Sequence, residues 1–324
     1  MAAIPRVVVV TRQTEYAALL GRHGTREQAR FFLATRGRTI EELEAADAVV
    51  RSAVSAVAAA VPTEWRRVKV DRGDLDRFLF EPEDVVVAVG QDGLVANVAK
   101  YLAGQLVIGC NPDPARYEGV LVAHAAAEMK VLVPAAVASQ VAVGERSMVE
   151  AVLDDGLRLL ALNEVFVGHK SHQSARYSIV ASGRTERQSS SGVVVTTGTG
   201  ATGWGRSIAL ERHSRLPMPG AGERALAFFV REAWPSVATG ASLTEGRIDA
   251  DGTEGPDIVF ILLPAANRSA IDRFRCGIVG TVDKEKILAI RSGNQGAHGS
   301  DLVRGIVEQY ICVQQSICFR HRLE

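Results

Sequence analysis

The chain has 324 residues, of which 47% are hydrophobic and 23% charged, and its 37 basic and 37 acidic residues cancel. This composition is typical of a globular protein, and the length suffices for one large or two medium domains. The charge balance argues against a nucleic-acid partner bound through a broad basic face. No apolar run approaches the ~18 residues of a membrane span, and the first residues lack the layout of a secretory signal. We therefore expect a cytoplasmic protein with no membrane partner.

The first third of the chain alternates strand and helix patterns. Capping-box patterns at Thr25 and Thr39 predict two helices, the first through Thr35 and the second ending at Pro62. Strands are predicted over Val7–Val10, Val68–Val70, Asp84–Val89 and Leu106–Gly109, with a helix over Leu94–Ala103. A strand, a short crossover and a second apolar strand form a βαβ unit with parallel strands. Residues 1–150 are therefore expected to form a doubly wound α/β layer.

From about residue 150 the pattern changes to short β-like runs separated by Gly, Ser and charged turns. The predicted strands are Glu164–Val167, Tyr177–Ala181, Gly192–Thr197, Asp257–Leu263 and Gly277–Val282. A domain boundary is expected between 140 and 160, after a helical segment that ends near Asp154. Residues 151–290 then form a β-rich domain, and 291–324 form a helical segment that folds back.

A first glycine motif, G-x-G-x-x-G, spans Gly198–Gly203 after a strand-like run. The same pattern marks the dinucleotide-binding turn of dehydrogenases, where it opens a long helix. Here Pro217 and Pro219 interrupt the chain soon afterwards, and the motif lies in the β-rich half. A glycine-rich surface loop without a ligand is the alternative interpretation.

A second motif, Gly90-Gln91-Asp92-Gly93, lies between a predicted strand and a predicted helix. Main-chain N–H groups at such a turn, together with the helix N-terminus, suit a phosphate. A carboxylate beside phosphates is repulsive unless it takes a proton from an attacking hydroxyl or holds a metal. The alternative is an Asx-type turn or a helix cap, and the residues alone leave both interpretations open.

With both motifs in view, the chain resembles the NAD kinase family, which transfers a phosphoryl group from ATP to the adenosine-ribose 2′-hydroxyl of NAD. The likeness is greatest to the mitochondrial type and its bacterial relatives. It runs in order through Arg6–Thr11, the helical insert before Pro62, Val85–Gly93, Val107–Pro114, Ala161–Phe166, Ser190–Trp204 and Phe229–Glu232. The resemblance implies a Rossmann-like N-terminal domain followed by a β-rich, β-sandwich-like C-terminal domain. It also places Gly198–Gly203 on the family's adenine-binding loop, which replaces the dehydrogenase interpretation.

The resemblance implies a role for each residue that matches a family motif. Asp92 falls on the aspartate of the family's G-G-D-G-T, taken to be the general base, and Gly90, Gln91 and Gly93 fall on the ATP side. The residues expected to bind NAD are Asn111, Asn163, Glu164, Thr199, Thr202, Gly203, Trp204 and Ser207. Without the family, Asn163 and Glu164 are interpreted as a strand-start cap. The resemblance further implies Mg²⁺ with ATP, no resident metal site, and a homodimer or homotetramer.

The chain departs from the family where G-G-D-G-T reads Gly90-Gln91-Asp92-Gly93-Leu94. Gln91 adds bulk and Leu94 lacks a hydroxyl, and both changes fall on the ATP side. Two alternatives follow: an impaired homologue that binds NAD(P) as a sensor or regulatory protein, and a kinase with a different hydroxyl acceptor. The H-x-x-H pattern of His169 and His172 is interpreted as a solvated turn.

Overall fold

The computed structural model describes residues 4–153, 158–169, 173–249, 258–262, 273–279 and 311–312. This part of the chain divides into two compact units, of which the first ends at Val143 and the second begins at Gly144. The expected fold class is confirmed, because the first unit contains a parallel sheet with helices and the second contains two antiparallel sheets. The expected C-terminal segment 291–324 lies outside the described residues, apart from Ile311–Cys312.

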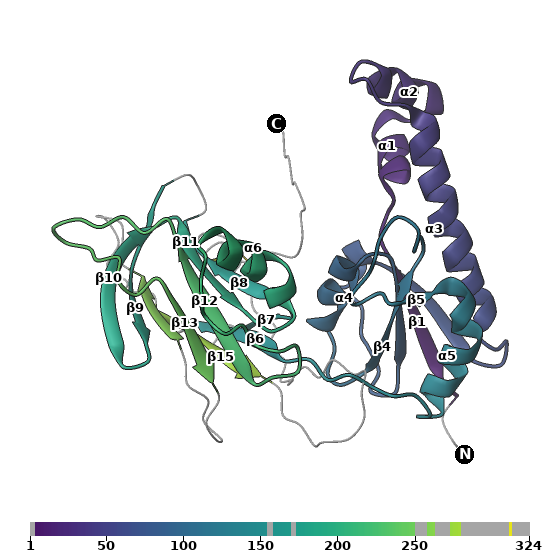
Figure 1. Cartoon of the computed structure of the whole chain (residues 1–324). Helices are drawn as coiled ribbons and strands as arrows, with labels where there is room; N and C mark the ends of the chain where they lie inside the picture. The colour runs from purple at the N-terminus through teal and green to yellow at the C-terminus, as the bar shows by residue number, and fades with distance from the viewer. Residues whose placement is uncertain are drawn as a thin grey trace. The chain divides into compact units, whose positions relative to one another are not determined.

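The first unit is built on a five-stranded parallel sheet with the order β2-β1-β3-β4-β5. The strands are β1 (Arg6–Thr11), β2 (Arg66–Asp71), β3 (Val85–Val89), β4 (Leu106–Asn111) and β5 (His124–Ala125), and two 3-10 turns are η1 (Arg72–Asp74) and η2 (Ala126–Glu128). Helices α3 (Ile40–Ala60) and α5 (Met129–Val137) pack on one face, around Val9 and Val87. Helix α4 (Asp92–Ala99) lies on the other side of the sheet (Figure 1).

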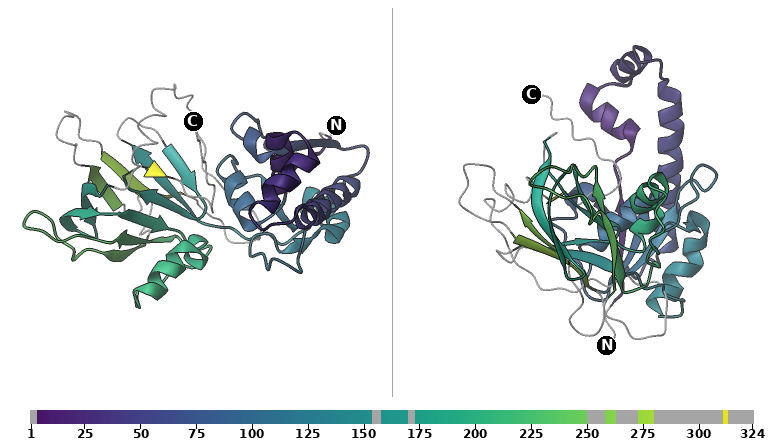
Figure 2. Two further views of the ribbon diagram at one scale, coloured as in Figure 1. Left: turned by 90° about the horizontal axis from the view of Figure 1, so that it is seen from above. Right: turned by 60° about the vertical axis from the view of Figure 1, so that its left-hand side comes forward.

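Two short helices, α1 (Glu15–His23) and α2 (Arg26–Ala34), lie at the end of α3 that is remote from the sheet (Figures 1 and 2). They share a small apolar cluster with the start of α3, formed by Leu19, Ala29, Leu33, Ile40 and Leu43. The predicted cap at Thr25 is confirmed, since its hydroxyl accepts from the Gln28 N–H at 3.2 Å, whereas Thr39 makes no side-chain cap bond. Among the described residues, no helix has the length and apolarity of a membrane span.

The second unit contains a six-stranded sheet, β10-β9-β14-β15-β6-β7, and a five-stranded sheet, β13-β12-β11-β8-β16. Its strands are β6 (Met148–Leu153), β7 (Arg158–Ala161), β8 (Glu164–Val167), β9 (Ala175–Ala181), β10 (Arg184–Ser190), β11 (Gly192–Thr196), β12 (Ala225–Arg231), β13 (Glu245–Asp249), β14 (Ile258–Leu262), β15 (Arg273–Val279) and β16 (Ile311–Cys312). A 3-10 turn, η3 (Gly200–Thr202), leads into helix α6 (Trp204–Glu211).

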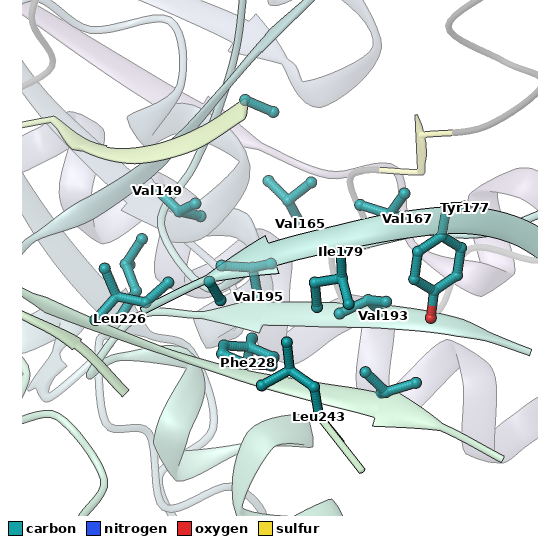
Figure 3. Packing of buried hydrophobic residues seen from close by; sticks show 14 of the residues in the cluster. Val149, Val165, Val167, Tyr177, Ile179, Val193, Val195, Leu226, Phe228 and Leu243 are labelled. Atoms are coloured by element: carbon teal, nitrogen blue, oxygen red, sulfur yellow. The ribbon is translucent and has the colours of Figure 1, made fainter. Parts of the chain in front are cut away.

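The core of the second unit lies between its two sheets. Side chains of β8 and β11 pack with those of β9 in this core, and Figure 3 shows Ile179 beside Val193 and Val195. Because side chains alternate along a strand, Glu164 and Phe166 point to the opposite face of the five-stranded sheet. That outer face is covered by α6, whose Ile208 packs there with Phe166.

Two sequence expectations are wrong. The segment before Asp154 is strand β6, not helix, because it pairs with both β7 and β15 and is buried on both faces, so its apolar run lacks strand alternation. Ile311–Cys312, expected within a helix, form β16, because their main chain pairs with the edge of β8.

Candidate functional site

The Gly90–Gly93 turn connects β3 to α4 at the carboxyl end of the parallel strand. The Gly90 N–H donates to the Cys110 carbonyl at 3.0 Å, which ties the turn to β4. Gln91 is the N-cap residue and has an extended backbone, with φ −103° and ψ 167°. Any residue adopts this conformation, so glutamine replaces the family's second glycine without backbone strain, and its side chain is exposed.

The Asp92 carboxylate accepts three main-chain hydrogen bonds from the loop between β4 and β5. Oδ1 accepts from the Leu121 and Val122 N–H groups at 2.7 and 3.0 Å, and Oδ2 accepts from the Val120 N–H at 2.9 Å. Asp92 is the first residue of α4, and the N-cap residue is Gln91. The Asp92 side chain thus bonds to a distant loop. A carboxylate has about four acceptor positions, so one position on Oδ2 remains for a ligand hydroxyl.

Leu94, which stands where the family has threonine, belongs to the core of the first unit. It is 4% exposed, and a Cβ added to Gly90 would lie 3.0 Å from its Cδ2 atom. The leucine thus packs over the glycine and leaves no room for a side chain at position 90. It offers no hydroxyl at the turn.

Asn111 ends β4, and its side-chain amide makes two hydrogen bonds within the following loop. Its Oδ1 accepts from the Asp113 N–H at 3.0 Å, and its Nδ2 donates to the Tyr117 carbonyl at 2.7 Å. The residue is 3% exposed. The contact of Asn111 with NAD stays a prediction, and in this geometry the amide holds the loop.

In the second unit, the loop from Thr197 to Gly203 is fastened to the chain just before β8. The Thr197 N–H donates to the Asn163 carbonyl at 2.9 Å, and its hydroxyl donates to the Leu162 carbonyl at 2.6 Å. The same hydroxyl accepts from the N–H groups of Thr199 and Gly200. Sequence reasoning missed Thr197, although a second threonine directly before the glycine motif was a usable signal.

The glycines of this motif are required by packing within the unit. A Cβ on Gly198 would collide with the Gly220 carbonyl, and one on Gly200 would collide with the Asn163 carbonyl. Gly203 has no such neighbour, since its nearest atom is 3.7 Å from an added Cβ. Gly198 thus brings the loop against Gly220, and Gly200 brings it against the chain before β8.

Three residues around this loop contain buried polar atoms that lack a hydrogen-bond partner: Asn163 (Oδ1), Glu164 (Oε2) and Thr199 (Oγ1). Within the described ranges only two other residues contain such an atom, His23 and Arg224. Buried polar groups are nearly always paired, and an unpaired one costs about 1–3 kcal/mol. Because the three belong to neighbouring segments, they indicate a place where a polar ligand completes the hydrogen bonding.

Glu164 begins β8 and is 5% exposed. Burial raises the pKa of its carboxyl group from 4.5 to about 7. Near neutral pH the group therefore exists in both its protonated and its ionised form, so it can donate or accept a hydrogen bond with a ligand hydroxyl.

The other predicted NAD-binding residues lie around the start of α6. Trp204 is half-buried, with its ring centroid 5.7 Å from that of Phe166 and the Arg231 guanidinium 5.6 Å above it. Thr202 is exposed, and its hydroxyl donates to the Thr199 carbonyl at 2.9 Å. Gly203 and Ser207 are also exposed. Sequence reasoning did not single out Arg231. Among the described residues, its guanidinium is the cationic group that lies over the Trp204 ring.

Among the residues that the structure describes, no group of three His, Cys, Asp or Glu side chains is placed to hold a metal ion. Of the H-x-x-H pattern, His172 lies outside the described residues.

Solved structures similar to this chain include two kinases. The yeast NADH kinase in complex with NADH aligns with a TM-score of 0.49 and 15% identity, covering 94% of this chain and 87% of the kinase. An NAD kinase from Archaeoglobus fulgidus in complex with ATP aligns with a TM-score of 0.50 and 13% identity, covering 89% of this chain and 94% of the kinase. No protein-family model and no curated protein sequence matches. At such low identity the similarity establishes the fold.

Proposed function

We propose that the protein transfers the γ-phosphoryl group of Mg²⁺-ATP to the adenosine-ribose 2′-hydroxyl of NAD, which gives NADP and ADP. The observation that carries the proposal is the set of unpaired buried polar atoms on Asn163, Glu164 and Thr199. The family resemblance assigns all three residues to NAD independently of their burial and hydrogen bonding. A structural explanation of these residues, such as a strand-start cap, predicts satisfied side chains instead.

In the proposed reaction the ribose 2′-oxygen attacks the γ-phosphorus, and the bond from that phosphorus to the β,γ-bridging oxygen breaks. The 2′-hydroxyl proton passes to the Asp92 carboxylate through the acceptor position that Val120, Leu121 and Val122 leave open. Mg²⁺ bound to ATP would supply charge neutralisation at the phosphates. The Leu94 N–H donates to the Gln91 carbonyl at 2.8 Å, whereas the Asp92 and Gly93 N–H groups lie at the helix start, where N–H groups face negative charge favourably.

The fold supports the ATP side of the proposal. The Archaeoglobus fulgidus NAD kinase, which shares the fold, was solved with ATP. In this chain the Gly90–Gly93 turn at the end of β3 has the strand-turn-helix arrangement that phosphate sites use.

A second candidate is an NAD(P)-binding protein that transfers phosphate poorly. The observation that favours it is the buried Leu94, which provides no hydroxyl beside the turn. In this candidate Asn163, Glu164 and Thr199 still bind the ligand, and only the phosphoryl transfer is lost.

Incubating the protein with Mg²⁺-ATP and NAD and measuring NADP by chromatography tests the proposal. Asp92→Asn is expected to lower kcat by about 10²- to 10⁴-fold, the usual contribution of a general base. Glu211→Gln, an exposed carboxylate at the end of α6, is the matched control and should keep full turnover. Tight NAD binding without NADP formation would favour the second candidate, and equal turnover by Asp92→Asn would exclude Asp92 as the base.

A further inference from the structure

The connection between β4 and β5, residues 112–123 and here called the β4–β5 loop, is held in place at both of its ends. At its start, the Asn111 amide bonds the Asp113 N–H and the Tyr117 carbonyl. The Arg116 and Tyr117 N–H groups both donate to the Asp113 carbonyl at 3.1 Å, which closes a turn. Residues 113–117 therefore form a compact unit fixed to the end of β4.

The chain then returns past Asn111 toward Asp92. Gly119 has a φ of +70°, and a Cβ there would lie 2.6 Å from the Val122 carbonyl oxygen and 3.2 Å from the Asn111 Nδ2 atom. The Leu121 carbonyl crosses β4 at Gly109, where a side chain would collide with it. The returning segment is thus packed against the end of β4, at Gly109 and Asn111, where it donates its N–H groups to Asp92.

We propose that Asn111 is a positioning residue for Asp92. Its amide fixes the β4–β5 loop so that the Val120, Leu121 and Val122 N–H groups hold the Asp92 carboxylate in one orientation, and phosphoryl transfer depends on that orientation. This inference rests on the proposed function and changes the role expected for Asn111, from a contact of NAD to a support of the base. The buried amide carries it, since its carbonyl oxygen and one of its N–H groups both bond within the loop that supplies the three donors to Asp92.

The test combines substitutions at two positions. Asn111→Leu removes both loop bonds, and Gly119→Ala disturbs the same returning segment while the Asn111 amide stays present. We expect each to lower kcat by about 10- to 100-fold, the loss that a small misplacement of a reacting group produces. The KM for NAD and the NAD dissociation constant should stay within about twofold. Gln140→Leu makes a polar-to-apolar change at an exposed position after α5 and is the control.

Repeating Asn111→Leu in the Asp92→Asn background separates positioning from general damage. If Asn111 acts through Asp92, its effect on kcat falls to less than about twofold once the carboxylate is gone, because coupled residues are not additive. An equal loss in both backgrounds would overturn the proposal. A raised KM for NAD with unchanged kcat would also overturn it, and would restore Asn111 as a contact of NAD.

Amide hydrogen exchange provides a readout that does not need turnover. Exchange at Val120, Leu121 and Val122 should be faster in Asn111→Leu and in Asp92→Ala than in the wild type, with global stability checked by thermal unfolding. If the wild type forms no NADP, the proposed function fails, and exchange alone then decides whether Asn111 positions Asp92. Unchanged exchange at these three amides would contradict the positioning role whatever the activity.

Discussion

The Asp92 turn of the first unit and the polar group of the second unit differ in how their hydrogen-bonding atoms are satisfied. Asp92 accepts three main-chain N–H groups from its own unit. Asn163, Glu164 and Thr199 each keep a buried oxygen without a partner. The first arrangement holds the carboxylate in place before any ligand binds. The second carries an energetic cost that a bound ligand can offset, so under the proposed function the difference separates a residue placed to react from residues placed to bind.

The largest effect in the second unit is expected from Glu164→Gln. Burial raises the pKa of Glu164 from 4.5 to about 7. The buried carboxyl group therefore does not lower the free energy of unfolding below pH 4.5, where it is protonated in both states, and lowers it progressively as the pH rises to about 7. The glutamine variant should match the wild type near pH 4 and be more stable above pH 7, by up to about 3 kcal/mol from the size of the shift. Urea denaturation across this pH range measures the difference.

Glu211→Gln, which removes an exposed carboxylate, should show no such pH-dependent gain. A glutamine variant at position 164 that is less stable than the wild type at pH 8 would mean that the carboxylate has a partner in the protein. Glu164 would then be a structural residue, and the contrast between the two regions would disappear.

A smaller effect is expected from restoring the family's residues at the first turn. Leu94→Thr, combined with Gln91→Gly, should raise turnover by about tenfold if the missing hydroxyl and the added bulk weaken ATP handling. Because Leu94 is 4% exposed, the variant should also lose about 1–3 kcal/mol of stability. Initial rates at varied ATP concentration, with thermal unfolding in parallel, measure both effects.

Gln91→Gly alone is the control for the backbone, since Gln91 has an ordinary extended conformation. Unchanged turnover in the double variant would show that these two departures do not limit the reaction. The Gly90–Gly93 turn would then handle ATP without the two family residues. Its difference from the second unit would lie only in how its polar atoms are hydrogen-bonded.

Local patterns in the sequence predicted much of the fold. The Val7–Val10 run is the centre of β1, and Thr25 caps α2 as its T-x-x-Q pattern predicted. Helix α1 was not predicted, although the Thr14 hydroxyl accepts from the Ala17 N–H at 3.2 Å and caps it. Strand β6 was mistaken for helix because burial on both faces removes the alternation that identifies a strand.

The candidate site could be predicted only as far as motifs reach. The resemblance identified Asp92 and Glu164, but not what each bonds to. The donors to Asp92 are 28 to 30 residues away in sequence. No local pattern reveals that the Asn111 amide hydrogen-bonds to the β4–β5 loop. The reason for Gly198 is equally distant, because the atom that excludes a side chain there belongs to Gly220.

Calorimetric titration of NAD into the wild type, Asp92→Asn and Glu164→Gln, without ATP, tests the central claim most directly. The account predicts that Asp92→Asn binds NAD within about twofold of the wild type, whereas Glu164→Gln binds at least about tenfold more weakly, as expected for loss of a hydrogen bond to a charged group. Equal NAD affinity of all three proteins, or a loss confined to Asp92→Asn, would contradict the division between a reacting carboxylate in the first unit and binding residues in the second.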